Sequence, residues 1–237
     1  MEEDEAYTGY PANHYGSSVM DNDFPIVNER VTAYINSLAP DNSREIENIR
    51  EKAEKEYVPI IKRETESLLK TLITLKSPRN ILEIGAAVGY SALIMSGCMG
   101  VDSNITTIES FGKRVKEANE NFAALGMQDR IRLIDGDALE VLDILDDSFD
   151  MVFIDAAKGQ YGEFFNKAIK LCLPGAVILT DNVLQEGTIV ESRYLIEQRD
   201  RTVHSRMRDF LYDITHRDDV STSIIPIGDG VALSIVR

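Results

Sequence analysis

Beyond Pro78, short apolar segments alternate regularly with longer amphipathic ones, and this alternation constrains the fold more than any other feature of the sequence. Short apolar segments are typical of buried strands, and apolar residues that recur every three or four positions are typical of helices. The expected strands are Asn80–Ile84, Ile105–Glu109, Arg130–Ile134, Met151–Asp155 and Ala176–Thr180. The helices expected between them are Tyr90–Ser96, Lys113–Leu125, Ala138–Leu145 and Gly162–Leu173. Such alternation indicates an α/β fold, in which helices cover both faces of a parallel sheet.

The last part of the sequence adds two strands that run in opposite directions. Ser223–Ile227 and Val231–Val236 are apolar, and Gly228-Asp229-Gly230 between them is typical of a tight turn, so we expect an antiparallel hairpin. A long helix, at about Glu191–His216, precedes this hairpin. The whole prediction is a Rossmann-like, doubly wound and mostly parallel seven-stranded sheet that ends in an antiparallel hairpin.

The residues before Pro78 divide into an extension and a group of helices. Residues 1–30 are polar and acidic, and we expect them to form a flexible extension without a core of its own. Helical spacing of apolar residues then predicts three helices, at about Val31–Leu38, Arg44–Lys55 and Ile60–Leu72. Residues 31–237 are therefore expected to form a single domain that includes these helices.

Composition narrows the classes of partner and compartment. The chain carries 25 basic and 40 acidic residues, a net charge of −15, which repels polyanions unless basic residues gather locally. No apolar run could span a membrane, and the acidic N-terminus does not resemble a secretory signal, so a cytoplasmic protein without membrane contact is expected. Cys98 and Cys172 show no zinc or disulfide pattern, and His14, His204 and His216 are expected on the surface.

A glycine-containing loop follows the first expected strand. Gly85 and Gly89 would let the backbone approach a ligand at the start of a helix. Their G-x-x-x-G spacing differs from the dinucleotide fingerprint, which disfavours a nicotinamide enzyme. Glu109 ends the second strand, where it can accept hydrogen bonds from ribose hydroxyls. A glycine pair alone can be a simple turn, but together with Glu83 and Gly136-Asp137-Ala138 it favours a nucleoside-bearing cofactor without a diphosphate.

Polar residues end the fourth and fifth expected strands. Asp155 follows one strand and Asp181-Asn182 follows the next, so adjacent parallel strands would bring them to one edge of the sheet. Two carboxylates and an amide oxygen suit Mg²⁺ or a similar divalent cation, which would lower the pKa of a substrate hydroxyl. Lys158 is close enough in sequence to accept the hydroxyl proton or to stabilise the oxyanion. An isolated Asp at a strand end is usually a cap, so the combination carries the metal hypothesis.

These residues together resemble the S-adenosylmethionine-dependent, cation-dependent O-methyltransferases of the catechol and caffeoyl-CoA type, over about Val31–Arg237. The motifs that carry the resemblance are Leu82-Glu83-Ile84-Gly85, Gly89-Tyr90-Ser91, Asp155 with Lys158, Asp181-Asn182 and Gly228-Asp229-Gly230. The resemblance implies the class I methyltransferase fold and a homodimer. It also implies that S-adenosylmethionine contacts Val58, Glu83, Gly85, Gly89, Ser91, Glu109, Asp137, Ala138 and Asp155. By the same resemblance Asp155, Asp181 and Asn182 would hold the metal, and the catalytic residues would be Lys158 and Asp155.

Within this family the sequence is most similar to the bacterial branch that methylates 5-hydroxyuridine in tRNA. The similar stretches are Glu56–Ile60, Asp155–Tyr161 and Ile225–Gly230, whereas plant caffeoyl-CoA enzymes usually have a second acid in place of Ala157. This resemblance implies methylation of the wobble nucleotide to 5-methoxyuridine. The alternative is a small catechol-like or phenolic acceptor. A protein that binds the cofactor without catalysis is a further alternative, which the intact metal and lysine set disfavours.

A tRNA partner requires a local basic surface on this acidic chain. Between Arg193 and Arg217 there are six arginines and four acids. If this stretch is helical, its arginines lie opposite or beside an apolar face, where they could contact the anticodon backbone. The candidate contacts are Arg199, Arg201, Arg206 and Arg208. Pairing with the neighbouring acids on a solvated helix explains the same pattern equally well.

Overall fold

The computed structural model describes residues 26–237. Residues 1–25 of the extension predicted at residues 1–30, which include His14, therefore lie outside the described residues. Helix α1 (Glu29–Leu38) already includes the last two residues of that predicted extension, because the Asn28 side chain accepts hydrogen bonds from the backbone of Arg30 and Val31 and caps the helix.

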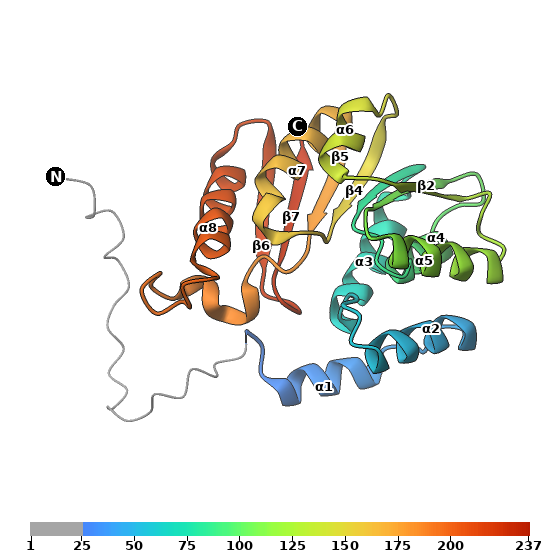
Figure 1. Cartoon of the computed structure of the whole chain (residues 1–237), viewed down its shortest axis with the longest axis horizontal. Coiled ribbons are helices and arrows are strands. Elements are labelled where there is room, and N and C mark those ends of the chain that lie inside the picture. Colours follow the sequence, from blue (N-terminus) through green and yellow to red (C-terminus); the bar gives the residue numbers. More distant parts are fainter. Residues whose placement is uncertain (1–25) are drawn as a thin grey trace.

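A seven-stranded sheet in the order β3-β2-β1-β4-β5-β7-β6 forms the centre of the molecule (Figure 1). The first five strands are parallel, and β7 lies antiparallel between β5 and β6. The strands are β1 (Asn80–Ile84), β2 (Asn104–Glu109), β3 (Ile131–Asp135), β4 (Phe149–Ile154), β5 (Cys172–Thr180), β6 (Val220–Ile225) and β7 (Val231–Val236). The predicted doubly wound sheet with a C-terminal antiparallel hairpin is confirmed.

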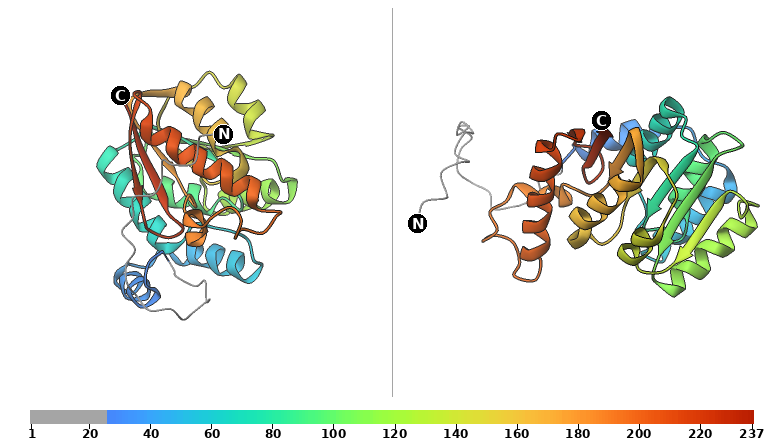
Figure 2. Two further views of the ribbon diagram at one scale, coloured as in Figure 1. Left: turned by 90° about the vertical axis from the view of Figure 1, so that its left-hand side faces the viewer. Right: turned by 90° about the horizontal axis from the view of Figure 1, so that it is seen from above.

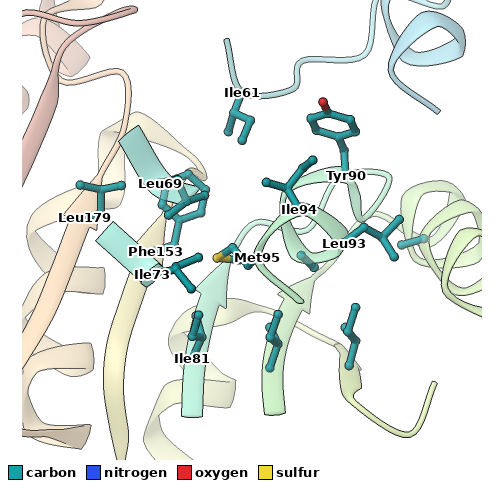
Figure 3. Close-up of a cluster of buried hydrophobic side chains, with 14 of the residues drawn as sticks. Ile61, Leu69, Ile73, Ile81, Tyr90, Leu93, Ile94, Met95, Phe153 and Leu179 are labelled. Carbon is teal, nitrogen blue, oxygen red and sulfur yellow. The ribbon is translucent and has the colours of Figure 1, made fainter. Parts of the chain in front are cut away.

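Helices cover both faces of this sheet (Figure 2). They are α2 (Arg44–Lys55), α3 (Arg63–Lys76), α4 (Tyr90–Cys98), α5 (Gly112–Ala124), α6 (Ala138–Ile144), α7 (Tyr161–Ala168) and α8 (Arg201–His216). Successive residues of a strand point to opposite faces, so Ile81 packs with α2 to α5 while Leu82 packs with α6 to α8. Figure 3 shows the first of these two clusters of buried side chains. No helix among residues 26–237 is long and apolar enough to cross a membrane.

The structure corrects the predicted helix at Glu191–His216, which begins only at Arg201. Residues 191–200 form turns and bends instead. The apolar face of α8 consists of residues buried against β6 and α7, whereas Tyr194 and Leu195 upstream are exposed. A helix in a folded protein depends mainly on packing of one face, and the segment before Arg201 has no such face to pack.

Smaller differences concern where elements begin and end. Helix α7 ends at Ala168, a short 3₁₀ turn follows, and β5 begins at Cys172, four positions earlier than predicted. The cause is a pairing of Cys172 with Phe149 across a shift in register between β4 and β5. Ile60 and Ile61 precede α3 instead of starting it. They belong to a connecting segment that lies near the carboxyl ends of the parallel strands.

Gly85 allows the chain to leave β1 in a crowded place. Its φ is +99°, and a Cβ atom here would lie 2.1 Å from the backbone oxygen of Asp155 at the end of β4. The amides of Gly85 and Ala86 both donate to the carbonyl of Ile108 at the end of β2. The loop after β1 is therefore held between the backbones of its two neighbouring strands.

We expect Gly85→Ala to lower the free energy of unfolding by about 3 kcal/mol, because the methyl group meets backbone that cannot move aside and φ is unfavourable. Gly97→Ala in α4 is the matched control, since nothing lies within 4 Å of the position that its methyl group would take and helix propensity favours Ala by about 0.8 kcal/mol. Urea denaturation of both variants measures the difference. Equal stability of the two variants would contradict the close approach.

Candidate functional site

A cleft of about 760 Å³ opens at the carboxyl ends of the parallel strands. It lies where the strand order reverses between β1 and β4, the place where open α/β sheets bind their ligands. One side is the loop after β1, a second comprises the ends of β2 to β5, and the third is residues 58–62, which connect α2 to α3. Of this third wall the sequence indicated only Val58 as a cofactor contact, because the apolar spacing of Ile60 and Ile61 predicted that they begin a helix.

Seven of the nine residues predicted to contact the cofactor line this cleft. They are Val58, Gly85, Ser91, Glu109, Asp137, Ala138 and Asp155. The other two, Glu83 and Gly89, lie behind the loop. Glu83 is fully buried, and Gly89 precedes α4 with φ +78° in close contact with Phe122. From these positions Glu83 and Gly89 support the loop after β1, whose other residues face the cleft.

Glu109 organises the loop from the end of β2. Its carboxylate accepts the backbone amides of Ala87 at 2.9 Å, Ser110 at 3.0 Å and Phe111 at 2.9 Å. Oε1 accepts the bonds from Ser110 and Phe111, and Oε2 accepts the bond from Ala87, so one lone pair of Oε2 remains for a hydrogen bond from a ribose hydroxyl. Asp137 likewise has two roles: its side chain accepts hydrogen bonds from the amides of Leu139 and Glu140 and so caps α6, and the residue also lines the cleft.

The residues predicted to hold a metal do lie together. The Asn182 side-chain amide donates to Asp155 Oδ1 at 2.8 Å, and the Asn182 backbone amide donates to Asp181 Oδ1 at 2.8 Å. Burial raises the pKa of both carboxyl groups, that of Asp181 to about 7, and the charge of Asp155 adds to the effect on Asp181. Asn182 has φ +62°, a strained conformation that often marks functional residues.

This arrangement fits a divalent cation on the chemistry of its donors. Two neighbouring buried carboxylates repel each other, and a cation between them would offset both that repulsion and their loss of hydration. Rotation of the Asn182 amide would present its oxygen as a third hard donor. Within residues 26–237 no group of three or more His, Cys, Asp or Glu side chains could hold a metal, so water or substrate oxygens would complete the coordination here. Lys158 also lines the cleft, in a 3₁₀ turn (Lys158–Gln160) directly after β4.

An ion pair between distant parts of the chain closes one end of the cleft. Lys62 Nζ lies 2.7 Å from Asp229 Oδ1, and both residues line the cleft. Asp229 belongs to the glycine-rich turn that the sequence identified as a hairpin connection and as a family motif, without a predicted place in the site. Nothing in the local sequence of Lys62 indicates this contact, because its partner lies 167 positions away.

Most of the arginines proposed as tRNA contacts hold backbone in place, and only Arg206 contacts the turn that carries Lys158 at the cleft. Three donate to carbonyl oxygens: Arg201 to Ile196, Arg206 to Gly159 and Arg208 to Glu191. Arg199 is exposed and lies within 4 Å of the acids Glu197 and Asp200. The bond from Arg206 places α8 against the turn that carries Lys158.

His204 in α8 corrects a prediction, because it is buried and not a surface residue. Only 2% of it is exposed, and its Nε2 lies 3.2 Å from the carbonyl oxygen of Thr188. Position 204 continues the three- and four-residue spacing of Met207, Phe210 and Ile214 on the buried face of α8. The prediction missed it because histidine is polar and was not counted as part of an apolar face.

A doubly wound sheet in which antiparallel β7 lies between β5 and β6, with a glycine loop at the strand-order reversal, matches the fold of the class I methyltransferases, which take the methyl group from S-adenosylmethionine. Comparison with known proteins gives the narrower group. A sequence model of the O-methyltransferase family matches residues 36–236, and the chain belongs to that family of S-adenosylmethionine-dependent enzymes.

Individual relatives agree with this assignment. Catechol O-methyltransferase of Mycobacterium tuberculosis is 34% identical over 164 residues, which cover 67% of this chain and 72% of that enzyme. Catechol O-methyltransferase of Niastella koreensis is 33% identical over 127 residues, but the match spans only 52% of this chain and 58% of that enzyme.

A solved structure extends the comparison to the whole fold and the cofactor. An O-methyltransferase from Streptomyces achromogenes, solved with S-adenosylmethionine bound, matches with a TM-score of 0.77 at 29% identity and covers 87% of this chain and 96% of that chain. Together with the family, this structure supports S-adenosylmethionine as the cofactor of the cleft.

Glu83 predicts a pH dependence of stability. Burial raises its pKa to about 7, although hydrogen bonds from Ser91 and Thr107 act in the opposite direction. The folded protein therefore keeps this proton at pH values where the unfolded chain, with the ordinary pKa of 4.5, has lost it. The contribution of Glu83 to the free energy of unfolding is fully present below about pH 4.5. As the pH rises from there to about pH 7, this contribution falls by up to ~1.4 kcal/mol per pH unit.

We expect Glu83→Gln to remove this loss, so that the variant gains stability relative to the unchanged protein between about pH 5 and about pH 7. Denaturant unfolding across that range measures the difference, and Glu120→Gln on the exposed face of α5 serves as the matched control. Parallel pH curves for Glu83→Gln and the unchanged protein would show that Glu83 does not carry the proton.

Proposed function

We propose that this protein transfers the methyl group of S-adenosylmethionine to a hydroxyl that lies next to a second oxygen, with a divalent cation bound at the same site. The observation that carries the proposal is the group formed by buried Asp181 with half-buried Asp155 and Asn182, which shares one cleft with the cofactor loop. A pair of adjacent oxygens is the acceptor that such a site suits, since both oxygens can complete the coordination of one ion.

Each group of residues has a separate task in this mechanism. The loop after β1 and Glu109 bind and orient the cofactor, while Asp155, Asp181 and Asn182 fix the acceptor oxygens beside it. When bound, the cofactor supplies an electrophilic methyl group and the cation lowers the pKa of the acceptor hydroxyl. Lys158 Nζ takes the hydroxyl proton or stabilises the resulting oxyanion. Proximity of the two reactants would then supply much of the rate enhancement.

As the acceptor we propose 5-hydroxyuridine at the wobble position of tRNA, which would become 5-methoxyuridine. Its hydroxyl lies beside the O4 carbonyl, an oxygen pair equivalent to that of a catechol. The support from this chain is α8, whose basic residues border the turn of Lys158 through the bond from Arg206 to Gly159. A polynucleotide whose base enters the cleft would pass along this helix and the turn before it, where Arg208 and Arg199 respectively are exposed.

A small catechol-like or phenolic acceptor is the second candidate. The names of the Mycobacterium tuberculosis and Niastella koreensis relatives favour it, and so does the net charge of −15. The arginine contacts with backbone carbonyls also give α8 a structural role that needs no nucleic acid.

We further propose that the protein acts in the cytoplasm as a homodimer. Helix α1 buries none of its own residues, and it exposes Val31, Tyr34, Ile35 and Leu38 at the spacing of one helical face. A second copy that covered this face would remove apolar surface from water.

We expect Asp155→Ala and Asp181→Ala each to lower metal-dependent turnover by at least ~100-fold, because each removes a charged cation ligand. Affinity for S-adenosylhomocysteine should change little in Asp181→Ala, since Asp181 is not among the predicted cofactor contacts and the cofactor loop remains intact. Transfer of tritium from labelled cofactor measures turnover, and calorimetry measures affinity. Asp143→Ala, an exposed acid of α6, is the matched control. Unchanged turnover in the presence of EDTA would exclude the role of the metal.

The acceptor is decided by offering tRNA that contains 5-hydroxyuridine, the same tRNA without the hydroxyl, and a catechol in separate reactions. We expect methylation of the first tRNA only. Combined Arg199→Ala and Arg208→Ala should weaken tRNA binding about tenfold and reduce its salt dependence. Arg132→Ala, at the opposite edge of the sheet, is the control. Methylation of the catechol alone would overturn the tRNA proposal and leave O-methylation itself intact.

A further inference from the structure

A buried polar network lies behind the cofactor cleft and is not explained by any motif in the sequence. Its centre is Arg50 of α2, Glu66 of α3 and Tyr90 of α4, of which only 5%, 4% and 1% are exposed. Burial of charged side chains costs free energy unless the charges are paired and their hydrogen bonds satisfied. A buried ion pair alone is therefore a poor source of stability, and its position in the molecule calls for a specific explanation.

Arg50 uses every side of its guanidinium group. Nε donates to the Tyr90 hydroxyl at 3.0 Å, and Nη1 donates to Glu54 at 2.9 Å. Nη2 donates to the backbone oxygen of Ile61 at 2.9 Å and to Glu66 at 3.2 Å. The Tyr90 hydroxyl completes the set by donating to Glu66 at 2.6 Å. One side chain thus joins two helices to a backbone carbonyl and to the start of a third helix.

The two outer ends of this network belong to opposite walls of the cofactor cleft. Tyr90 is the first residue of α4 and directly follows the glycine loop, and Ile61 belongs to residues 58–62 on the third wall. Both residues line the cleft, and Figure 3 shows them on separate elements at the edge of the buried cluster. The guanidinium group also lies over the Tyr90 ring, 4.9 Å from its centre.

Residues 58–62 are held by the burial of Val58 and Ile61 in the core cluster and by a small number of hydrogen bonds and ion pairs. The Val58 amide donates to Ala53, but the segment forms no helix or strand. Two side-chain ties join it to other parts of the described chain, the Arg50 bond to Ile61 and the ion pair of Lys62 with Asp229. The bond from Arg50 is buried, whereas the Lys62 side chain is about half exposed. The hydrogen bonds of Arg50 to Ile61 and Tyr90 thus form the buried connection that fixes the distance between this wall and the glycine loop.

We propose that Arg50 is a positioning residue for the cofactor, which holds residues 58–62 against the glycine loop so that the cleft has its binding shape before the cofactor arrives. A site that is already ordered loses less entropy on binding, so removal of the tie lowers affinity. The planar guanidinium group reaches several acceptors at once, which the ammonium group of a lysine cannot do. The proposal rests on cofactor binding in this cleft and needs neither the metal nor the acceptor proposed above.

The test compares Arg50→Met with Arg63→Met by calorimetric titration of S-adenosylhomocysteine, with no metal and no acceptor present. Arg63 is a matched control, because it joins the same two helices through Glu47 at 2.5 Å but touches neither Tyr90 nor Ile61. We expect the Kd to rise about tenfold in Arg50→Met, equal to ~1.4 kcal/mol, and to stay within about twofold in Arg63→Met. Arg50→Lys should recover part of the loss.

Kinetics give a second readout that a general loss of stability would not produce. The KM for S-adenosylmethionine should rise in Arg50→Met while kcat is retained, because the residue touches no reacting atom. A folded Arg50→Met variant with unchanged Kd overturns the proposal, and so does an equal loss in Arg63→Met, which would assign the effect to helix packing. If Arg50→Met does not fold, Tyr90→Phe decides: a Kd raised about threefold supports the tie, and an unchanged Kd overturns it.

Failure of this proposal differs from failure of the proposed function. If the unchanged protein binds S-adenosylhomocysteine but methylates none of the offered acceptors, the role of Arg50 in affinity remains measurable. If all variants bind equally well, the enzyme can still be a methyltransferase, and only the positioning role is lost.

Discussion

The reversal of strand order between β1 and β4 is the constraint on which the rest of the structure depends. At this point the chain must leave the sheet between two backbones, and only a residue without a side chain fits at Gly85. The same reversal separates the helices above the strand ends and opens the cleft. Because parallel strands all end at one edge, polar residues that directly follow them converge there without long loops.

How much could be predicted follows from how far each signal extends along the chain. Strands β1, β2 and β4 and the second half of β5 are buried on both faces, so their apolar runs identified them, whereas β3 at the edge of the sheet is only partly buried. The residues just after the strands identified most of the cleft. The prediction was wrong at residues 191–200, which were expected to begin the helix α8 but have no apolar face that packs against the rest of the fold. The sequence also held no indication of Arg50 or Lys62, since hydrogen-bonding partners far away in sequence leave no periodic signal.

The cleft separates the binding of the cofactor from the choice of acceptor. The loop after β1 and the ends of β2 and β3 present the residues for the cofactor, whereas the carboxylates follow β4 and β5 and the basic residues lie on α8. If the acceptor binds as proposed, substitutions on α8 would alter the choice of acceptor without disturbing the cofactor loop.

The position of β7 has a consequence for the newly made chain. Strand β5 pairs on one side with β4, and its other edge is covered only by β7, which lies more than fifty positions later in the sequence. During synthesis β5 therefore emerges with an open, strongly apolar edge that can pair with other chains. Slow translation between β5 and β7 would prolong this exposure, so the region between them is where synonymous codons should matter most for yield.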